Sequence, residues 1–461
     1  MRIYFLGIAG TAMGSLAILM KEKGHMVWGS DVAAYPPMKD LLAAAEIPVY
    51  EGYDVAHLKD PIDMVVIGNA LSRGNVEVEY ILNEGIPFTS LPALIHREFI
   101  QSKRSIVITG THGKTTTTAL MAHVLITAGQ DPTVFIGGVS RNLNTSVRLG
   151  KGPWVVLEGD EYDTAFFDKQ PKFLHYFPYY LIINNIEFDH ADIYANVEEI
   201  KLGFRRLMRV VPGKGLVVAN GESPHVRDVI EPAYSRLMLW GPRGDVVYRI
   251  LRIDDKGSHF QVWRKGDEPV TLHLPFPGEF QVQNAAAVFA VACDMGIPTN
   301  VIQQAMATFQ GVKRRMEEWG IWHGALVVDD FAHHPTAIQK TLQALKQRYP
   351  SKRLIALFEP RTNTTVRNLF QQELTQALAE ADTVVIAPIH RPERFPPKER
   401  LSIPTMVKQL QAMGKQAVSV TQYDQIIPVL ESILQDDDVL VLLTNGSLGG
   451  VYQQLRSKIG S

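Results

Sequence analysis

The residues best suited to chemistry lie in the segment 109–120, which reads TGTHGKTTTTAL. Gly110 and Gly113 allow backbone N–H groups to converge on an anion. Lys114 can neutralise phosphate charge, and the hydroxyl of Thr115 can bind Mg²⁺. The two glycines lie closer together than in the common G-x-x-x-x-G-K-[ST] loop. The pattern predicts a nucleotide phosphate loop, and a helix-capping turn is the simpler alternative.

Acidic and histidine side chains follow two other apolar runs. Glu158 is the first acid of LEGDEYD, and His190 lies in NNIEFDHADIY. Because Mg²⁺ prefers oxygen ligands, Glu158 can hold the cation beside a phosphate. His190 can ligate a metal or move a proton, although histidine is not a favoured ligand of Mg²⁺. A polar loop and a surface histidine are the alternative interpretations.

A glycine-rich segment near the N-terminus, GIAGTAMGS, is the third candidate. Gly7, Gly10 and Gly14 follow the pattern G-x-x-G-x-x-x-G, and Asp31 ends the next expected strand. This departure from G-x-G-x-x-G disfavours an NAD site and favours a diphosphate bound at a helix N-terminus.

A charged region begins the last third of the chain. Arg314 and Arg315 could reach phosphates, and Asp329 and Asp330 end a strand where ribose hydroxyls could be held. A charged linker followed by a helix cap explains the same residues without a ligand.

Short apolar runs alternate with helical patterns along the chain, which predicts parallel sheets covered by helices. An alternating stretch at 257–276 predicts an antiparallel addition to the second sheet. Expected strands are 2–8, 25–31, 63–70, 105–110, 154–160, 180–190, 325–330, 353–360, 383–388 and 438–446, and expected helices include 12–24 and 114–129.

Composition excludes several classes of protein. The net charge of −2 predicts no general affinity for nucleic acid. No apolar run approaches the roughly 18 residues that a membrane span requires. The N-terminus is expected to be a strand rather than a signal peptide. A single cysteine, Cys293, cannot form an internal disulfide, which predicts a cytoplasmic location.

Taken together, these strings resemble the Mur ligase family of ATP-dependent enzymes, which build the peptide stem of bacterial cell-wall precursors. The resemblance spans essentially the whole chain. It implies an α/β protein of three domains: an N-terminal Rossmann-like domain that binds a UDP-sugar (1–103), a central P-loop ATPase with a mixed sheet (104–317), and a C-terminal Rossmann-like domain that binds a peptide (318–461).

The strings GTHGKTTT and NNIEFDHAD are most similar to the branch that acts on UDP-N-acetylmuramic acid. SDVAAYPPM, IGNALSRGN and EGDEYDTAFFDKQPKF are closer still to its murein-recycling members. The implied reaction couples the lactyl carboxylate to the amine of a tripeptide, L-alanyl-γ-D-glutamyl-meso-diaminopimelate, through an acyl phosphate. ATP and Mg²⁺ are the implied cofactors. Because an exposed acyl phosphate would hydrolyse, we expect the C-terminal domain to bring in the peptide and exclude water.

The resemblance also implies site residues. Lys114, Glu158 and His190 would be catalytic, and Thr115, Glu158 and His190 would hold magnesium. ATP would contact Gly110, Thr111, Gly113, Lys114, Thr115, Thr116, Asn284, Arg315 and Asp330. The UDP-sugar would contact Gly10, Thr11, Ala12, Met13, Asp31, Asn69, Ser72 and His112. From their positions after strands, we predict that Arg361, Asn363 and His334 contact the peptide.

The chain departs from the family at two places. GEFQVQN has Phe280 and Gln281 where many relatives read G-x-H-N before the adenine asparagine. The position of a lysine that is carbamylated in some relatives holds Arg205, with Lys201 one turn earlier, so we predict no carbamylated lysine. Three other functions stay open: an L-alanine-adding ligase, an NAD-binding oxidoreductase, and a nucleotide-switched binding protein.

Overall fold

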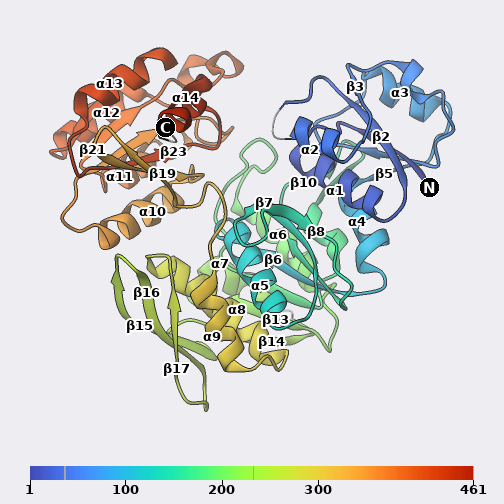
Figure 1. Ribbon diagram of the computed structural model, residues 1–461, viewed down its shortest axis with the longest axis horizontal. Helices are drawn as coiled ribbons and strands as arrows, with labels where there is room; N and C mark the ends of the chain where they lie inside the picture. Colours follow the sequence, from blue (N-terminus) through green and yellow to red (C-terminus); the bar gives the residue numbers. More distant parts are fainter. Residues whose placement is uncertain (36–37, 232, 460–461) are drawn as a thin grey trace. The chain divides into compact units, whose positions relative to one another are not determined.

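The structure is a computed structural model that describes residues 1–461 except 36–37, 232 and 460–461. The chain forms two compact units, and Figure 1 shows their elements coloured along the sequence. The first unit contains Met1–Glu187, Glu198–Trp240 and Ala290–Val301. The second contains Phe188–Val197, Gly241–Phe289 and Ile302–Ser461. Neither unit coincides with one of the predicted domains, whose boundaries stay predictions.

A parallel sheet in the order β3-β2-β1-β4-β5 forms the N-terminal part of the first unit. Its strands are β1 (Arg2–Leu6), β2 (Met26–Asp31), β3 (Val49–Glu51), β4 (Met64–Ile67) and β5 (Phe88–Ser90). The connecting helices are α1 (Thr11–Glu22), α2 (Met38–Ala44), α3 (Val76–Asn83) and α4 (Leu91–Ile95). The strand order reverses at β1 and β4, and parallel sheets bind ligands beyond the carboxyl ends of strands at such a point.

The phosphate loop belongs to a second sheet of the first unit, in which β14, β13, β12, β6, β9 and β7 are parallel and β8 is antiparallel. The strands are β6 (Arg104–Thr109), β7 (Thr133–Ser140), β8 (Thr145–Arg148), β9 (Trp154–Glu158), β12 (Tyr180–Ile183), β13 (Leu216–Asn220) and β14 (Arg236–Trp240). The helices are α5 (Lys114–Thr127), α6 (Val197–Met208) and α7 (Pro224–Ile230). A hairpin of β10 (Asp163–Ala165) and β11 (Asp168–Pro171) follows β9. The predicted mixed sheet is confirmed.

The segment Gly241–Phe289 of the second unit contains an antiparallel meander, as the alternating sequence predicts. Its strands are β15 (Val246–Asp254), β16 (Gly257–Arg264) and β17 (Val270–Leu274). Two helices follow in the chain, α8 (Glu279–Asp294) and α9 (Thr299–Thr308), and each has residues in both units because Ala290–Val301 belongs to the first.

The C-terminal sheet has the order β18-β19-β23-β20-β21-β22, with an antiparallel β18 and otherwise parallel strands. Leu354, Ala356 and Phe358 of β20 pack into one hydrophobic core, and Ile355 and Leu357 pack into another. Helices therefore cover both faces, as in a Rossmann-like domain. The strands are β18 (Glu317–Trp322), β19 (Ala325–Asp330), β20 (Leu354–Phe358), β21 (Thr383–Ile386), β22 (Gln416–Ser419) and β23 (Val439–Leu443). The helices are α10 (Pro335–Arg348), α11 (Gln371–Leu378), α12 (Ile403–Ala412), α13 (Ile426–Ile433) and α14 (Val451–Ile459).

Candidate active site

The predicted phosphate loop connects β6 to α5. Gly110 has a φ of +127° and Gly113 a φ of +82°, which are left-handed values that favour glycine. A Cβ on Gly110 would also lie 2.9 Å from the backbone N and O of Asn185. Because α5 begins at Lys114, the N–H groups of its first turn face the end of the loop. Such a helix N-terminus attracts anions.

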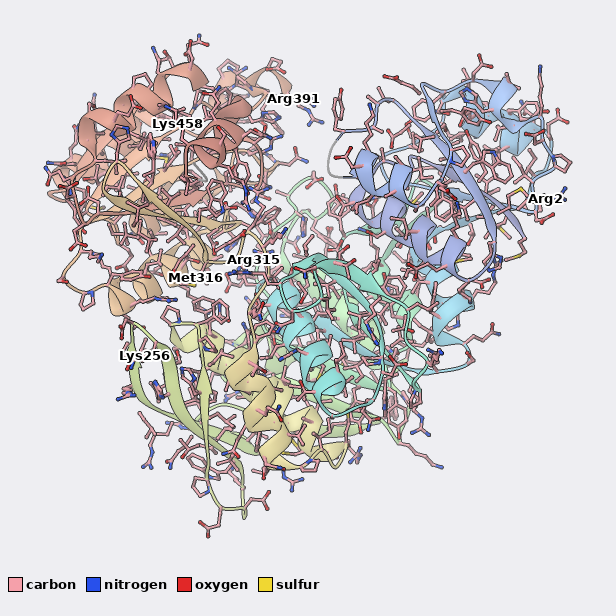
Figure 2. The ribbon with its side chains drawn as sticks, in the orientation of Figure 1. Arg2, Lys256, Arg315, Met316, Arg391 and Lys458 are labelled. Carbon is pink, nitrogen blue, oxygen red and sulfur yellow. The ribbon has the colours of Figure 1, made fainter. Side chains whose placement is uncertain are left out.

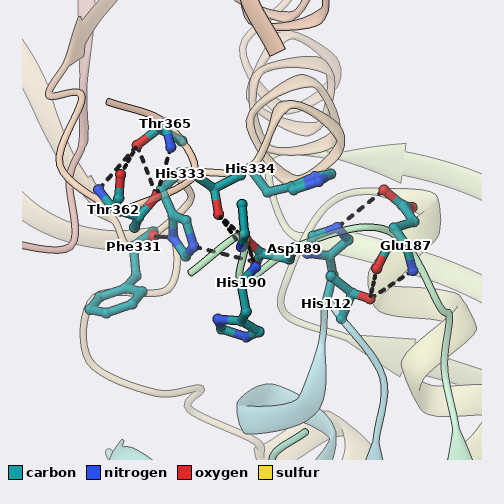
Figure 3. Close-up of polar contacts among 12 residues, drawn as sticks. His112, Glu187, Asp189, His190, Phe331, His333, His334, Thr362 and Thr365 are labelled. Carbon is teal, nitrogen blue, oxygen red and sulfur yellow. Dashed lines mark hydrogen bonds and ion pairs between the residues drawn. The ribbon is translucent and has the colours of Figure 1, made fainter. Parts of the chain in front are cut away.

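Asn185 holds the phosphate loop in shape. Its backbone O accepts a hydrogen bond from Thr111 N at 3.1 Å, and its Oδ1 accepts one from His112 N at 2.8 Å. His112 Nε2 lies 3.3 Å from a carboxylate oxygen of Glu187 (Figure 3). The N–H groups of Thr111 and His112 therefore stabilise the loop itself. The donors best placed for a phosphate are those of Gly113 and the first turn of α5.

Lys114 forms a buried ion pair with Glu161. Its Nζ lies 2.7 Å and 3.0 Å from the two carboxylate oxygens, and the side chains are 12% and 3% exposed. Burial alone lowers the pKa of Lys114, but the charges of Glu161, Asp160 and Glu158 outweigh it and raise the pKa. Lys114 is therefore a stable cation at the end of the phosphate loop.

Thr115 and Glu158 lie side by side, as a magnesium site requires. Thr115 Oγ1 donates to Glu158 Oε1 at 3.0 Å, and the backbone N of Gly137 donates to Glu158 Oε2 at 2.7 Å. A Cβ on Gly137 would lie 2.5 Å from that oxygen, so a larger residue here would force the Glu158 carboxylate to move. A hydroxyl and a carboxylate oxygen beside a phosphate loop fit the ligand chemistry of Mg²⁺. Thr116, the next residue of α5, is buried.

His190 lies in the second unit, whereas Thr115 and Glu158 belong to the first. Its φ is +54°, an uncommon value for a residue with a side chain. The metal role of His190 stays a prediction.

The N-terminus of α1 presents four of the predicted UDP-sugar residues. Its first N–H groups have no partner within the helix, which suits a diphosphate. Met13 is buried in the core, so only its backbone could serve a ligand. Asp31 accepts a hydrogen bond from Ala9 N at 2.9 Å and thereby supports the glycine loop. The residues Gly10, Thr11 and Ala12 are exposed.

Asn69 connects the N-terminal sheet to the hairpin after Glu158. Its Nδ2 donates to Asp163 Oδ1 at 3.0 Å, and Lys169 Nζ donates to the other oxygen of Asp163 at 2.6 Å. Ser72, also predicted to contact the UDP-sugar, lies three residues after Asn69 and is exposed.

Asn284 lies on α8 in the second unit, one turn after Gln281. Their side chains are 6% and 3% exposed. The amide that is predicted to read adenine is thus nearly enclosed by protein, and its adenine contact stays a prediction.

Asp330 ties the segment before β18 to β19. Its two carboxylate oxygens accept hydrogen bonds from Met316 N and Ala332 N, both at 2.8 Å. Burial raises the pKa of Asp330, although Arg315 opposes the shift. The guanidinium of Arg315 lies 4.8 Å from the ring centre of Phe331, and Figure 2 labels Arg315 beside Met316.

Arg314 is engaged within the second unit. It donates to the backbone oxygens of Thr444 at 2.7 Å and Gly446 at 3.0 Å, and its Nε lies 3.5 Å from Asp329. Burial raises the pKa of Asp329 to about 7. These contacts give Arg314 a structural role that the sequence did not reveal.

The predicted peptide residue Arg361 lies after β20 in a polar cluster. One guanidinium nitrogen lies 3.4 Å from buried Glu359 and 3.4 Å from Nδ1 of His390. A Cβ on Gly446 would overlap Arg361 Nε, so this glycine leaves room for the guanidinium. Asn363 lies half-buried in the same loop.

His334 caps α10. Its Nδ1 accepts a hydrogen bond from Thr336 N at 3.3 Å, so Nε2 carries the proton and donates to Phe188 O at 3.1 Å. Both ring nitrogens thus serve the backbone, and the predicted peptide contact of His334 stays a prediction.

Comparison with known proteins decides the family. Three family descriptions match successive parts of the chain: "Mur ligase family, catalytic domain" at residues 2–102, "Mur ligase middle domain" at 108–292 and "Mur ligase, glutamate ligase domain" at 314–446. The UDP-N-acetylmuramate–L-alanyl-γ-D-glutamyl-meso-2,6-diaminoheptandioate ligases of Haemophilus influenzae and Escherichia coli are 35% and 36% identical. Each covers 99% of this chain, which in turn covers 99% and 97% of theirs. The chain belongs to the Mur ligase family.

Solved structures agree with this Mur ligase assignment. A murein peptide ligase from Psychrobacter arcticus has a TM-score of 0.75 and 33% identity, covering 100% of this chain and 99% of its own. A UDP-N-acetylmuramate–alanine ligase from Thermotoga maritima has a TM-score of 0.80 and 25% identity, with 99% of each chain covered. The three-domain α/β fold is thereby confirmed.

The family assignment makes this protein an ATP-dependent, amide-bond-forming ligase, as predicted. It also accounts for the phosphate loop, which an NAD-binding oxidoreductase leaves unexplained. None of the helices in the described part of the chain has both the length and the hydrophobicity to cross a bilayer.

Several residues of the site escaped the sequence analysis. Glu161 lies in LEGDEYD three residues after Glu158, and Asn185 lies in NNIEFDHADIY five residues before His190. Gly137 carries no local signal, because its importance arises from the close approach of Glu158. Lys201, by contrast, was named from the sequence; its Nζ lies 2.7 Å from both Glu198 and Asp228, and the absence of a carbamylated lysine stays a prediction.

Proposed function

We propose that this Mur ligase joins the lactyl carboxylate of UDP-N-acetylmuramic acid to the amine of L-alanyl-γ-D-glutamyl-meso-diaminopimelate in murein recycling. The observation that carries the proposal is full-length similarity to two relatives named for this ligation, at 35% and 36% identity. The L-alanine ligases of Clostridium kluyveri and a Psychrobacter species are less similar, at 32% and 30%. We place the reaction in the cytoplasm, a reducing compartment that suits a chain with a single cysteine, Cys293.

The first step brings two anions together. The substrate carboxylate attacks the γ-phosphorus of ATP, and ADP leaves as the acyl phosphate forms. Lys114 and the N–H groups at the start of α5 supply positive potential where negative charge accumulates. Magnesium, when bound by Thr115 and Glu158 with His190 as the further proposed ligand, would reduce the repulsion between nucleotide and carboxylate.

The second step forms the amide. The neutral amine of the peptide attacks the acyl carbon, and phosphate leaves from the tetrahedral intermediate. Lys114 can stabilise the departing phosphate because it remains at the same position. We propose that the domains are 1–103, 104–317 and 318–461, and that the last of them binds the peptide through Arg361, Asn363 and His334.

The proposed binding residues follow the same division. The UDP-sugar would lie on the start of α1, with Asn69 and Ser72 at the next strand end. The nucleotide would lie on the phosphate loop. Proposed ATP contacts are Gly110, Thr111, Gly113, Lys114, Thr115, Thr116, Asn284, Arg315 and Asp330, and proposed UDP-sugar contacts are Gly10, Thr11, Ala12, Met13, Asp31, Asn69, Ser72 and His112.

The function is tested by offering the full-length protein ATP, magnesium, UDP-N-acetylmuramic acid and either the tripeptide or L-alanine. Mass spectrometry of the product and phosphate release are the readouts. We expect the tripeptide adduct, with kcat/KM for the tripeptide about 10²-fold higher than for L-alanine. Preference for L-alanine would support the other ligase. ATP consumption without a UDP-linked product would support a nucleotide-switched binding protein.

Replacing Arg361 with alanine is expected to raise the KM for the tripeptide about tenfold, equivalent to about 1.4 kcal/mol. The tripeptide carries carboxylates, with which a guanidinium forms charge-assisted hydrogen bonds. The KM for ATP should change less than about twofold in this variant if the residue serves only the peptide. Arg249, an exposed arginine of β15, provides the control variant Arg249→Ala. An unchanged tripeptide KM in Arg361→Ala would remove Arg361 from the peptide site.

A further inference from the structure

The segment that carries His190 is attached by a buried hydrogen bond to residues 318–461, called here the C-terminal part of the chain. Thr364 Oγ1 donates to Asp189 Oδ1 at 2.9 Å, across 175 residues of sequence. The two residues are 2% and 5% exposed. The same carboxylate oxygen accepts a hydrogen bond from His190 N at 2.7 Å. Asp189 thus connects the backbone of His190 directly to the loop after β20.

Further contacts reinforce this attachment within the second unit. Phe188 O accepts the hydrogen bond from His334, and the rings of Phe188 and Phe370 lie 6.2 Å apart. Ala191 N lies 3.4 Å from Thr364 Oγ1. Ala191 O accepts a hydrogen bond from Arg367 at 3.3 Å. Every residue from 188 to 191 is therefore held, directly or through its neighbour, by residues of the C-terminal part.

The backbone of His190 is fixed in a strained conformation. Its φ of +54° is left-handed, and such values in residues other than glycine persist only where surrounding contacts impose them. Its N–H is bound to Asp189, and its O accepts hydrogen bonds from Ile193 N at 2.9 Å and Tyr194 N at 3.0 Å. In Figure 3 the imidazole of His190 points away from Asp189 and His333. The contacts thus set the direction in which the imidazole leaves the backbone.

We propose that Thr364, acting through Asp189, is a positioning residue for His190. His190 follows β12 in sequence, but its position is determined by residues of the C-terminal part. The consequence rests on the proposed function: the part that supplies the amine also positions one of the groups proposed to hold magnesium. Formation of the acyl phosphate is thereby coupled to the C-terminal part, which supplies the amine that consumes the acyl phosphate.

The test compares Thr364→Val, Thr364→Ser and a matched buried threonine, Thr375→Val. Valine keeps the shape of threonine but removes the hydroxyl, so Asp189 loses a donor and Ala191 N loses an acceptor. Thr375 is 1% exposed on α11 and donates to Gln371 O at 2.7 Å, far from His190 in sequence. We expect Thr364→Val to lower kcat about tenfold while Thr364→Ser stays within about twofold of the native enzyme. Thr375→Val should keep its kcat and change only thermal stability.

A second readout does not depend on turnover. Titration of Mn²⁺ in the presence of ADP, followed by the electron paramagnetic resonance signal of free Mn²⁺, measures metal affinity directly. We expect Thr364→Val to weaken Mn²⁺ binding about tenfold and Thr364→Ser to restore it, because loss of a residue that orients a metal ligand typically costs about 10- to 100-fold in affinity. Unchanged kcat and Mn²⁺ affinity in Thr364→Val would overturn the proposal. The proposal would also be overturned if Thr364→Ser lost as much kcat and Mn²⁺ affinity as Thr364→Val. Equal losses in Thr375→Val would overturn it as well. If the native protein made no tripeptide adduct, the proposed function would fail, while the Mn²⁺ titration would still decide the role of Thr364.

Discussion

Replacing Lys114 with alanine is expected to lower turnover by about 10³-fold or more, which is the scale for loss of a positive charge at a phosphoryl-transfer centre. Lys114 begins α5 directly after the phosphate loop, and its cationic form is stabilised by the surrounding acids. Without it, the loop loses the cationic side chain that opposes the repulsion between ATP and the substrate carboxylate. Phosphate release in the presence of both substrates measures the loss.

The same substitution also affects stability, and a second variant separates the two effects. Removing Lys114 leaves the buried carboxylate of Glu161 without its ion-pair partner, which destabilises folded proteins by about 3 kcal/mol. The double variant Lys114→Ala/Glu161→Gln removes this charge and should recover most of the lost stability without recovering turnover. Lys256→Ala, at the exposed turn between β15 and β16, is the control for loss of a lysine. Full turnover in Lys114→Ala would contradict the proposed mechanism.

Replacing Glu158 with glutamine is expected to lower kcat about 10²-fold and to raise the magnesium concentration required for half-maximal rate. Glutamine preserves the size of the side chain and an oxygen that can accept the hydrogen bond from Thr115. It removes the negative charge that would hold the cation beside the phosphates. Calorimetric titration with ADP and magnesium should show weaker, less metal-dependent nucleotide binding.

Glu84, an exposed residue at the end of α3, provides the control Glu84→Gln. This variant should retain both turnover and magnesium dependence. If Glu158→Gln bound nucleotide and magnesium as the native protein does, the assignment of Glu158 to the cation would be wrong. The role of Thr115 would then have to be tested on its own.

Much of the fold follows from local patterns in the sequence. The apolar runs at 2–8, 105–110 and 325–330 became β1, β6 and β19 because their lengths and flanking polar residues are typical of buried parallel strands. The position of the phosphate loop could be predicted equally well. Glycine, lysine and threonine at adjacent positions restrict the backbone conformation and the charge there.

The contacts that surround these residues could not be predicted from local sequence in the same way. Glu161 reaches Lys114 across 47 residues, and Asn185 reaches the loop across 73. Both contacts exist because β6 pairs with β9 on one side and β12 on the other, an order that no local pattern encodes. Residue types therefore revealed which side chains carry charge, but not which partners hold them in place.

The case of His190 shows the difference most clearly. Its residue type and its place after a strand marked it as a candidate from the sequence alone. Only the tertiary structure attached it, through Asp189, to Thr364, which lies 175 positions after Asp189 in the chain. Sequence by itself determined which side chains could carry charge, accept phosphate or ligate a metal, because these are properties of residue type and short spacing. The tertiary structure decided their partners and directions, because packing brings together groups whose separation along the chain exceeds any local preference.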